Sequence, residues 1–254
     1  MSLVEYELAG TLAIVSINRP ESRNAVDRAT ADKLARAFRR FDSDPALSVA
    51  ILTGTRGCFC AGADLKAVST NRGNRVTETG DGPLGCTRML LSKPVIAAVE
   101  GYAVAGGLEL ALWCDMRVAA RDAVFGVFCR RWGVPLVDGG TIRLPRLIGM
   151  SHAMDMILTG RGVSGDEALR IGLVNRLTEK GDTLQAAREL AAQIAAFPQR
   201  CMRSDRMSTY EGWTMPQAEA MVNEYRHGIA TVNSGETREG AARFAAGAGR
   251  HGTF

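Results

Sequence analysis

Two short segments rich in small residues are where the chemistry of this chain is expected to lie. Residues 60–65 read CAGADL and residues 101–110 read GYAVAGGLEL. Each follows an apolar run that predicts a strand, at residues 49–53 and 94–99, and each leads into a predicted helix. The first N–H groups of a helix are unpaired and carry partial positive charge, and glycine or alanine keeps side-chain atoms away from an approaching carbonyl. The two segments together predict an oxyanion hole, which serves acyl chemistry.

Three further segments complete a pattern. They are NRPESRNA at residues 18–25, LTGR at 158–161 and EALRIGLVN at 167–175. With the two glycine-bearing segments, in this order, the chain resembles the crotonase (enoyl-CoA hydratase/isomerase) family over nearly its whole length. The resemblance implies an α/β fold, a crotonase-like spiral of repeated ββα units with a helical C-terminal appendage. Periodicity alone predicts only an α/β protein.

The resemblance also implies a division of the chain. Residues 1–196 would form the spiral core with an acyl-CoA site, and residues 197–254 a helical oligomerisation region that joins trimers, or dimers of trimers. From the sequence alone, an apolar helical tail of this kind could equally pack on its own core.

The resemblance assigns the oxyanion donors to the main-chain N–H groups of Ala63 and Gly106. These would polarise a thioester carbonyl and stabilise an enolate. Glu109 follows Gly106 by three residues and so lies in the first helical turn beside that carbonyl. It is the best acid/base candidate. The alternative is an ordinary carboxylate stabilised by the helix dipole.

The chain departs from the family at Cys129. Hydratases of the family carry a second glutamate twenty residues after the first, and here that position is a cysteine. A thiol is a poor substitute for a carboxyl as proton donor and cannot orient water in the same way. The competing interpretation of Cys129 is a small buried hydrophobic residue.

Asp138 is the candidate replacement for the missing glutamate. It follows Cys129 by nine residues, where some relatives with other chemistries place an aspartate that faces the acyl group. The hypothesis is that Glu109 and Asp138 form the working carboxylate pair. Alternatively, Asp138 caps a helix that begins near Gly139, or pairs with a nearby arginine (Arg130, Arg131 or Arg143).

Coenzyme A is expected only as part of a thioester substrate, with no permanently bound cofactor. By resemblance, residues 61–65 line its pantetheine and adenine, with Ala61, Ala63, Asp64 and Leu65 as the binding positions. Arg23 and Lys66 are the nearest candidate phosphate partners, or else solvated surface charges.

Composition agrees with this interpretation. A chain of 254 residues with 46% hydrophobic content can bury a substantial core. The net charge of +4 comes from basic residues that are mostly scattered, as on a solvated surface. A mildly basic balance suits an anionic ligand that carries a nucleotide. No RNA-recognition or zinc-finger motif supports a nucleic-acid partner, and RNA binding is the most distant of the functions considered.

Other classes are disfavoured by particular segments. Residues 1–7 are acidic and alternate in polarity, unlike a secretory signal, so a cytoplasmic location is expected. The apolar window at residues 95–114 contains Glu100 and Glu109 and is interpreted as a buried strand, turn and helix rather than a membrane span. The 6 cysteines are irregularly spaced, which favours reduced thiols, and the 3 histidines match no metal or triad motif. No bound metal is expected.

Local signals place several elements. Residues 11–18 predict a strand, and Asp27 predicts the N-cap of a helix with Leu34, Phe38 and Phe41 on one face. Ser164 and Glu167 form a predicted capping box. Residues 69–83 have no periodicity and are interpreted as a mobile loop, either one that shapes an acyl pocket or plain surface. The tail predicts helices that are interrupted at Pro198 and at residues 234–236.

Enoyl-CoA hydration is the leading function that the resemblance implies. Double-bond isomerisation or another lyase reaction is the alternative enzyme function, because one base beside an oxyanion hole can move a proton between carbons without activating water. A CoA-thioester-binding subunit that has lost turnover is the alternative outside catalysis, motivated by Cys129.

Overall fold

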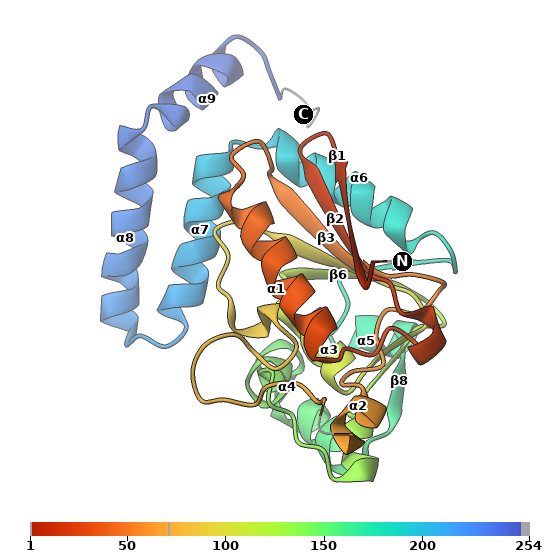
Figure 1. Ribbon diagram of the computed structural model, residues 1–254. Coiled ribbons are helices and arrows are strands. Elements are labelled where there is room, and N and C mark those ends of the chain that lie inside the picture. The colour runs from red at the N-terminus through yellow and green to blue at the C-terminus, as the bar shows by residue number, and fades with distance from the viewer. Residues whose placement is uncertain (1, 71, 250–254) are drawn as a thin grey trace. The chain divides into compact units, whose positions relative to one another are not determined.

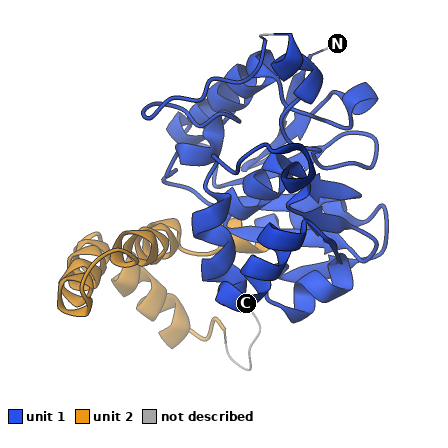
Figure 2. Cartoon of the chain, turned by 90° about the horizontal axis from the view of Figure 1, so that it is seen from below, with its two compact units in different colours: residues 1–192 blue, residues 193–254 orange. Residues whose placement is uncertain are grey.

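The computed structural model describes residues 2–70 and 72–249, which form two compact units. Residues 1–192 make the first unit and residues 193–254 the second (Figure 2). Helix α6 (Thr183–Ala196) contains the boundary between them. No helix in the described residues is both long enough and apolar enough to cross a membrane.

A six-stranded sheet forms the centre of the first unit. Its order is β1-β2-β3-β4-β6-β9, with β1 antiparallel to β2 and every other pair parallel. The strands are β1 (Val4–Ala9), β2 (Leu12–Ile17), β3 (Val49–Gly54), β4 (Val95–Val99), β6 (Met116–Ala120) and β9 (Arg176–Thr178). Strands β3 and β4 are almost entirely buried, as parallel strands covered on both faces must be. The predicted strands at residues 11–18, 49–53 and 94–99 are therefore confirmed.

A second, three-stranded sheet turns the chain into a spiral. It consists of β5 (Tyr102–Val104), β7 (Val124–Gly126) and β8 (Gly162–Ser164), in the order β5-β7-β8. Strands β4 and β6 of the large sheet are each followed by a strand of the small sheet and then by a helix, α3 (Gly106–Trp113) or α4 (Gly140–Thr159). Strand β3 is followed by an isolated bridge from Cys60 to Ala103, which takes the place of the small-sheet strand, and then by the helix α2 (Leu65–Ser69). This repetition is the predicted ββα spiral.

Helix α1 (Arg28–Ser43) covers one face of the large sheet (Figure 1). The Asp27 side chain accepts the Thr30 N–H at 2.9 Å, which confirms the predicted N-cap. Leu34, Phe38 and Phe41 are fully buried, as their shared face predicts. Phe38 packs edge-on against Trp113 of α3, with the ring centroids 4.7 Å apart.

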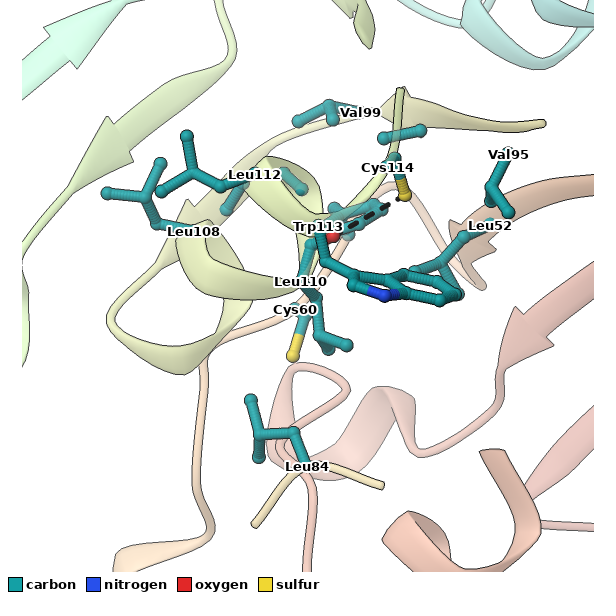
Figure 3. Packing of buried hydrophobic residues seen from close by; sticks show 14 of the residues in the cluster. Leu52, Cys60, Leu84, Val95, Val99, Leu108, Leu110, Leu112, Trp113 and Cys114 are labelled. Carbon is teal, nitrogen blue, oxygen red and sulfur yellow. Dashed lines mark hydrogen bonds between the residues drawn. The ribbon is translucent and has the colours of Figure 1, made fainter. Parts of the chain in front are cut away.

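Apart from Glu109, the side chains of helix α3 are apolar on every side, because the helix runs through the core. Figure 3 shows Leu108, Leu110, Leu112 and Trp113 around it, with Cys60 and Leu84 close by. The thiol of Cys114, just beyond the helix, donates to the Leu110 carbonyl. The helix that follows Gly106 is therefore held rigidly, which matters for any group on its first turn.

A buried arginine closes the end of this helix. Arg117 of β6 is only 2% exposed. Its guanidinium donates to the carbonyls of Leu173 at 2.6 Å, Cys114 at 2.8 Å and Ala111 at 3.3 Å. It thereby pairs carbonyl groups that would otherwise be buried without donors.

The predicted capping box at α5 (Gly165–Arg170) is half right. The Ser164 hydroxyl accepts the Glu167 N–H at 3.3 Å, as expected. The Glu167 carboxylate does not return to residue 164. It forms a two-pronged ion pair with Arg161, at 2.9 and 2.6 Å, because a charge-assisted fork is stronger than one bond to a main-chain N–H.

The second unit is helical. It contains α7 (Gln199–Gly212), α8 (Gln217–Asn233) and α9 (Glu236–Ala245). Glu211 of α7 bonds Asn223 and His227 of α8, at 2.9 and 2.8 Å. The predicted breaks at Pro198 and at residues 234–236 are confirmed. The role of this region in oligomerisation stays a prediction.

Candidate active site

A bridge between the two glycine-bearing segments brings them side by side. Cys60 pairs with the strand β5, donating its N–H to the Tyr102 carbonyl at 2.8 Å and accepting from Val104 at 3.1 Å. The pairing is parallel, so the residues that follow each strand end at the same edge. Residues 61–63 therefore lie beside residues 104–106.

The main-chain amides of Ala63 and Gly106 meet at this edge. A methyl group built on Gly106 would lie 3.5 Å from the Ala63 nitrogen, and one built on Gly62 would lie 2.8 Å from the Gly106 nitrogen. Neither amide donates a hydrogen bond to any residue in the described parts of the chain. Two unpaired donors this close together are suited to a shared oxygen.

The turn before Gly106 is strained. Ala105 has φ of 54° and ψ of −125°, a conformation that side chains other than glycine rarely adopt. Its N–H is held by the Gly126 carbonyl at 2.8 Å. Such strain persists only where the surrounding structure enforces it, and here it sets the direction of the Gly106 amide.

Glu109 lies on the first turn of α3 and is 2% exposed. Its Oε1 accepts the N–H groups of Asp138 at 2.9 Å and Gly140 at 2.7 Å. Burial raises the pKa of Glu109 to about 7, with the charge of Asp138 acting in the same direction and the hydrogen bond from Gly140 opposing it. The carboxyl can therefore release or take a proton near neutral pH.

Asp138 lies next to Glu109 and is also buried. Its Oδ1 accepts the Leu84 N–H at 3.0 Å and the Thr87 hydroxyl, and no described residue donates to Oδ2. Burial raises its pKa. Asp138 does not cap α4, whose N-cap is Gly139 with no side-chain bond.

The predicted pairing of Asp138 with an arginine takes a different form. Arg143 donates to the main-chain carbonyl of Asp138, at 2.9 Å. Its second bond, at 2.7 Å, goes to the Thr87 carbonyl. The arginine therefore fixes the backbone around Asp138.

A cavity of about 610 Å³ joins these groups. Ala63, Gly106, Glu109 and Asp138 all line it, so the structure brings together the four predicted catalytic positions. The rest of the wall is mostly apolar and is formed by Leu65, Val68, Val76, Leu84, Val104, Phe128, Trp132, Val134, Pro135 and Val137. Cys129 lines it as well, and burial followed by the charge of Glu109 raises the pKa of its thiol. Cys129 is thus a neutral group near neutral pH.

The predicted coenzyme positions divide into two sets. Ala61, Ala63 and Leu65 line the cavity, whereas Arg23, Asp64 and Lys66 are not among its lining residues. Asp64 caps α2 and forms an ion pair with Arg19 at 2.9 Å. The Arg23 guanidinium lies 5.8 Å from the centre of the Tyr102 ring.

Comparison with known proteins identifies the family. The family model described as enoyl-CoA hydratase/isomerase matches residues 7–247. The chain belongs to the enoyl-CoA hydratase/isomerase family. It is 37% identical over 244 residues to a protein named enoyl-CoA hydratase EchA19 of Mycobacterium tuberculosis, covering 94% of this chain and 92% of that one. It is 37% identical over 240 residues to mevalonyl-coenzyme A hydratase sidH of Aspergillus fumigatus, covering 92% and 88%.

The fold agrees with this membership. The crystal structure of enoyl-CoA hydratase EchA1 from Mycobacterium marinum superposes with a TM-score of 0.91 at 39% identity, covering 96% of each chain. The crotonase-like fold predicted from the sequence motifs is therefore confirmed.

Sequence reasoning missed the residues that position the carboxylate of Asp138. Leu84 and Thr87 lie in a segment without periodicity, and their bonds to Asp138 span more than fifty residues. It also missed Arg28 and Asn74 on the cavity wall. The only sequence signal was the expected pocket loop at residues 69–83, and Gly73, Asn74, Val76 and Pro83 do line the cavity.

Proposed function

We propose that this protein is an enoyl-CoA hydratase that stabilises the enolate of an acyl-CoA thioester with the amides of Ala63 and Gly106. The observation that carries the proposal is a single cavity lined both by the residues of the two amides, which donate to no described residue, and by the two carboxyl residues Glu109 and Asp138. One such amide typically contributes about 3 kcal/mol to the transition state. The names of the relatives, enoyl-CoA hydratase and mevalonyl-coenzyme A hydratase, support the substrate class.

The proposed reaction uses Glu109 and Asp138 as a pair. One carboxylate takes a proton from a water molecule while the oxygen of that water bonds to the β-carbon. The electrons of the double bond move onto the thioester oxygen. The other carboxyl, in its neutral form, gives a proton to the α-carbon as the enolate collapses. A pKa of about 7 at Glu109 supports either role, and the raised pKa of Asp138 supports a neutral form at the same time.

Isomerisation is the second candidate, because Cys129 stands where hydratases of the family have their second glutamate. In that reaction Glu109 alone would move a proton from the α-carbon to the γ-carbon or back. A non-catalytic acyl-CoA-binding subunit is the third candidate.

Absorbance of the conjugated thioester separates these candidates. Hydration of a 2-enoyl-CoA removes the signal, isomerisation of a 3-enoyl-CoA creates it, and a binding subunit changes neither while still binding a saturated acyl-CoA in calorimetry. We expect loss of signal from 2-enoyl-CoA, with kcat lowered about 10²- to 10⁴-fold in Glu109→Gln and at least about 10²-fold in Asp138→Asn. Glu189→Gln, on the exposed side of α6, is the matched control. Wild-type rates from both active-site variants would end the proposal.

The remaining features are proposed on the resemblance. Coenzyme A enters only as part of the substrate, with Arg23, Asp64 and Lys66 outside the cavity as candidate contacts for its nucleotide part. The protein is cytoplasmic and binds no nucleic acid. Residues 197–254 join homotrimers or dimers of trimers. The second unit and the exposed apolar side chains of α8 support this last point.

A further inference from the structure

The carboxyl of Asp138 is held partly by a hydroxyl group, whereas that of Glu109 is held by peptide N–H groups. Asp138 Oδ1 accepts the Leu84 N–H at 3.0 Å and also the hydroxyl of Thr87. Leu84 and Thr87 are each 1% exposed. Because both donors engage the same oxygen, proton transfer with a substrate falls to the other oxygen, Oδ2.

Thr87 lies behind Asp138 and away from the surface of the cavity. It is the middle residue of the short helix η2 (Cys86–Arg88). Leu84 and Asp138 are lining residues of the cavity, but Thr87 is not one of them. A substrate in the cavity therefore does not touch Thr87, and its hydroxyl can influence a reaction there only through Asp138.

The backbone of Gly82 packs directly against the hydroxyl and the carboxyl. A methyl group built on Gly82 would overlap the hydroxyl oxygen of Thr87 and would lie 3.0 Å from Asp138 Oδ1. Only glycine leaves room for this close approach. Any side chain at this position would displace either the donor or the acceptor, so the place of the Thr87 hydroxyl is closely defined.

Arg143 connects the backbones of the two residues. Its guanidinium donates to the carbonyl of Asp138 at 2.9 Å and to the carbonyl of Thr87 at 2.7 Å. A planar guanidinium can bridge two acceptors in a fixed geometry. Gly139 has φ of 96°, and a methyl group there would overlap the guanidinium. The separation of Thr87 and Asp138 is thus set by main-chain contacts as well as by the bond between their side chains.

We propose that Thr87 is a positioning residue for Asp138 in the proposed hydration, and that Arg143 holds the two residues in register. The hydroxyl fixes Oδ1, so that Oδ2 is the oxygen that exchanges a proton with the substrate. The inference rests on the proposed pair of Glu109 and Asp138 and adds the group that orients one member of it.

The hydroxyl also acts on the protonation of Asp138. Burial raises the pKa of Asp138, and the hydrogen bond from Thr87 opposes this rise because it favours the charged carboxylate. Removing the hydroxyl should therefore raise the pKa further. The other ionisable groups that face Asp138 are unchanged by a substitution at Thr87, and they are Glu109 of α3, Cys86 and Arg88 of η2, Arg143 of α4, and Cys60 after β3.

Thr87→Val tests the positioning role, because it removes the hydroxyl and keeps nearly the same shape. We expect kcat on a 2-enoyl-CoA to fall by about 10- to 100-fold, as for a misplaced catalytic group. The calorimetric Kd of a saturated acyl-CoA should stay unchanged, since Thr87 does not line the cavity. Thr87→Ser brings back the hydroxyl and should restore kcat.

Thr53→Val is the matched control. The Thr53 hydroxyl is also buried and donates to the Ala98 carbonyl at 2.9 Å, but Thr53 does not line the cavity. The substitution therefore removes a comparable buried hydroxyl at a distance from Asp138. It should leave kcat unchanged.

Titration of Asp138 tests the contact without any turnover. Infrared spectroscopy follows the band of the protonated carboxyl with pH, and the band of Asp138 is the one that Asp138→Asn lacks. We expect its midpoint to rise by about one pH unit or more in Thr87→Val, because a hydrogen bond to a charged group is lost. Thr53→Val should keep the wild-type midpoint. A purely structural role of Thr87 would lower stability without moving this titration.

The outcomes separate this proposal from the catalytic one. In an active enzyme, an unchanged kcat or an unchanged titration in Thr87→Val would overturn the positioning role, as would an equal loss of kcat in Thr53→Val or a failure of Thr87→Ser to restore it. A shifted titration in a protein that hydrates no enoyl thioester would keep the contact and reject the hydration. If Thr87→Val does not fold, Arg143→Lys decides, because lysine keeps the charge but cannot bridge both carbonyls. An unchanged kcat in that variant would overturn the proposal.

Discussion

Two opposing effects act on the pKa of Glu109. The protein around it removes water, which favours the neutral form, while two main-chain N–H groups donate to Oε1, which favours the charged form. Burial prevails, and the pKa of about 7 places the group where acid/base catalysis is effective. Such a carboxyl also has a measurable effect on stability.

We predict that stability falls as the pH rises from about 5 to 8 because of Glu109. Between its ordinary pKa of 4.5 and the folded value of about 7, the folded state keeps a proton that the unfolded state has released. The free energy of unfolding then decreases by up to about 3 kcal/mol across this window. Glu109→Gln removes that part of the dependence, which urea unfolding at several pH values measures. Glu189→Gln should follow the wild-type curve, and identical pH profiles of Glu109→Gln and wild type would contradict the raised pKa.

At the scale of residues, the sequence identified the groups but not their partners. Gly106 and Glu109 could be selected because one short motif places them within a single helical turn, and Ala63 because it lies in the other glycine-bearing segment. The donors to Asp138, by contrast, come from Leu84 and Thr87, and nothing local in the sequence links those positions. Long-range hydrogen bonds depend on how elements pack, which residue types alone do not determine.

At the scale of elements, Gly62 controls the distance between the two glycine-bearing turns. It has φ of 94°, and a methyl group there would lie 2.8 Å from the Gly106 nitrogen. We predict that Gly62→Ala displaces this amide and lowers kcat/KM by about 10²-fold or more, as removal of one oxyanion donor does. Steady-state kinetics with a 2-enoyl-CoA measures the loss.

Gly181 provides the control for that substitution. Its φ of 95° matches that of Gly62, but a methyl group there meets nothing within 4 Å. Gly181→Ala therefore carries the same backbone strain and should keep its activity. Equal activity of the two variants would show that the turn tolerates the methyl group.

A second prediction at this scale concerns the junction of α3 and β6. Arg117→Met leaves the carbonyls of Leu173, Cys114 and Ala111 without their donor. We expect the free energy of unfolding to fall by about 3 kcal/mol or more, since each buried unpaired acceptor is destabilising by about 1 to 3 kcal/mol. Denaturant unfolding checks this. Arg121→Met, which removes only exposed ion pairs on the same segment, should leave the unfolding midpoint unchanged.

Elements were more predictable than their connections. The N-cap at Asp27 and the break at Pro198 follow from local chemistry, and the structure confirms both. The three-residue strands β5, β7 and β8 are too short to produce a periodic signal, so the second sheet was visible only through the family resemblance. The side chain of Glu167 bonds Arg161, six residues earlier, rather than the main-chain N–H that its motif predicted.

At the scale of the whole molecule, α8 carries an apolar stripe. Met221, Tyr225, Ile229 and Val232 share one face by their spacing, and all four are exposed, Tyr225 by 67%. Large exposed apolar side chains in a continuous stripe mark an interaction surface. The stripe is consistent with the proposed oligomer and gives it a specific test.

We predict a trimer or hexamer in sedimentation equilibrium and a smaller species after Tyr225→Lys combined with Ile229→Lys. Two lysines on the stripe would bring unpaired charge into an apolar contact. Glu224→Lys, which adds a lysine beside the stripe, is the control and should keep the assembly. A monomeric wild-type protein would contradict the proposed assembly, and an unchanged mass in the double variant would place the contact elsewhere.

The anchoring of Glu109 has a consequence for how this fold can change its chemistry. The two donors that hold its Oε1 are peptide groups, which every amino acid except proline carries at those positions. Replacing the side chains around the cavity therefore leaves the orientation of this carboxylate unchanged. A protein built this way can carry Cys129 near this carboxyl, or alter the side chains of the cavity wall, and still hold the carboxyl of Glu109 in the same position.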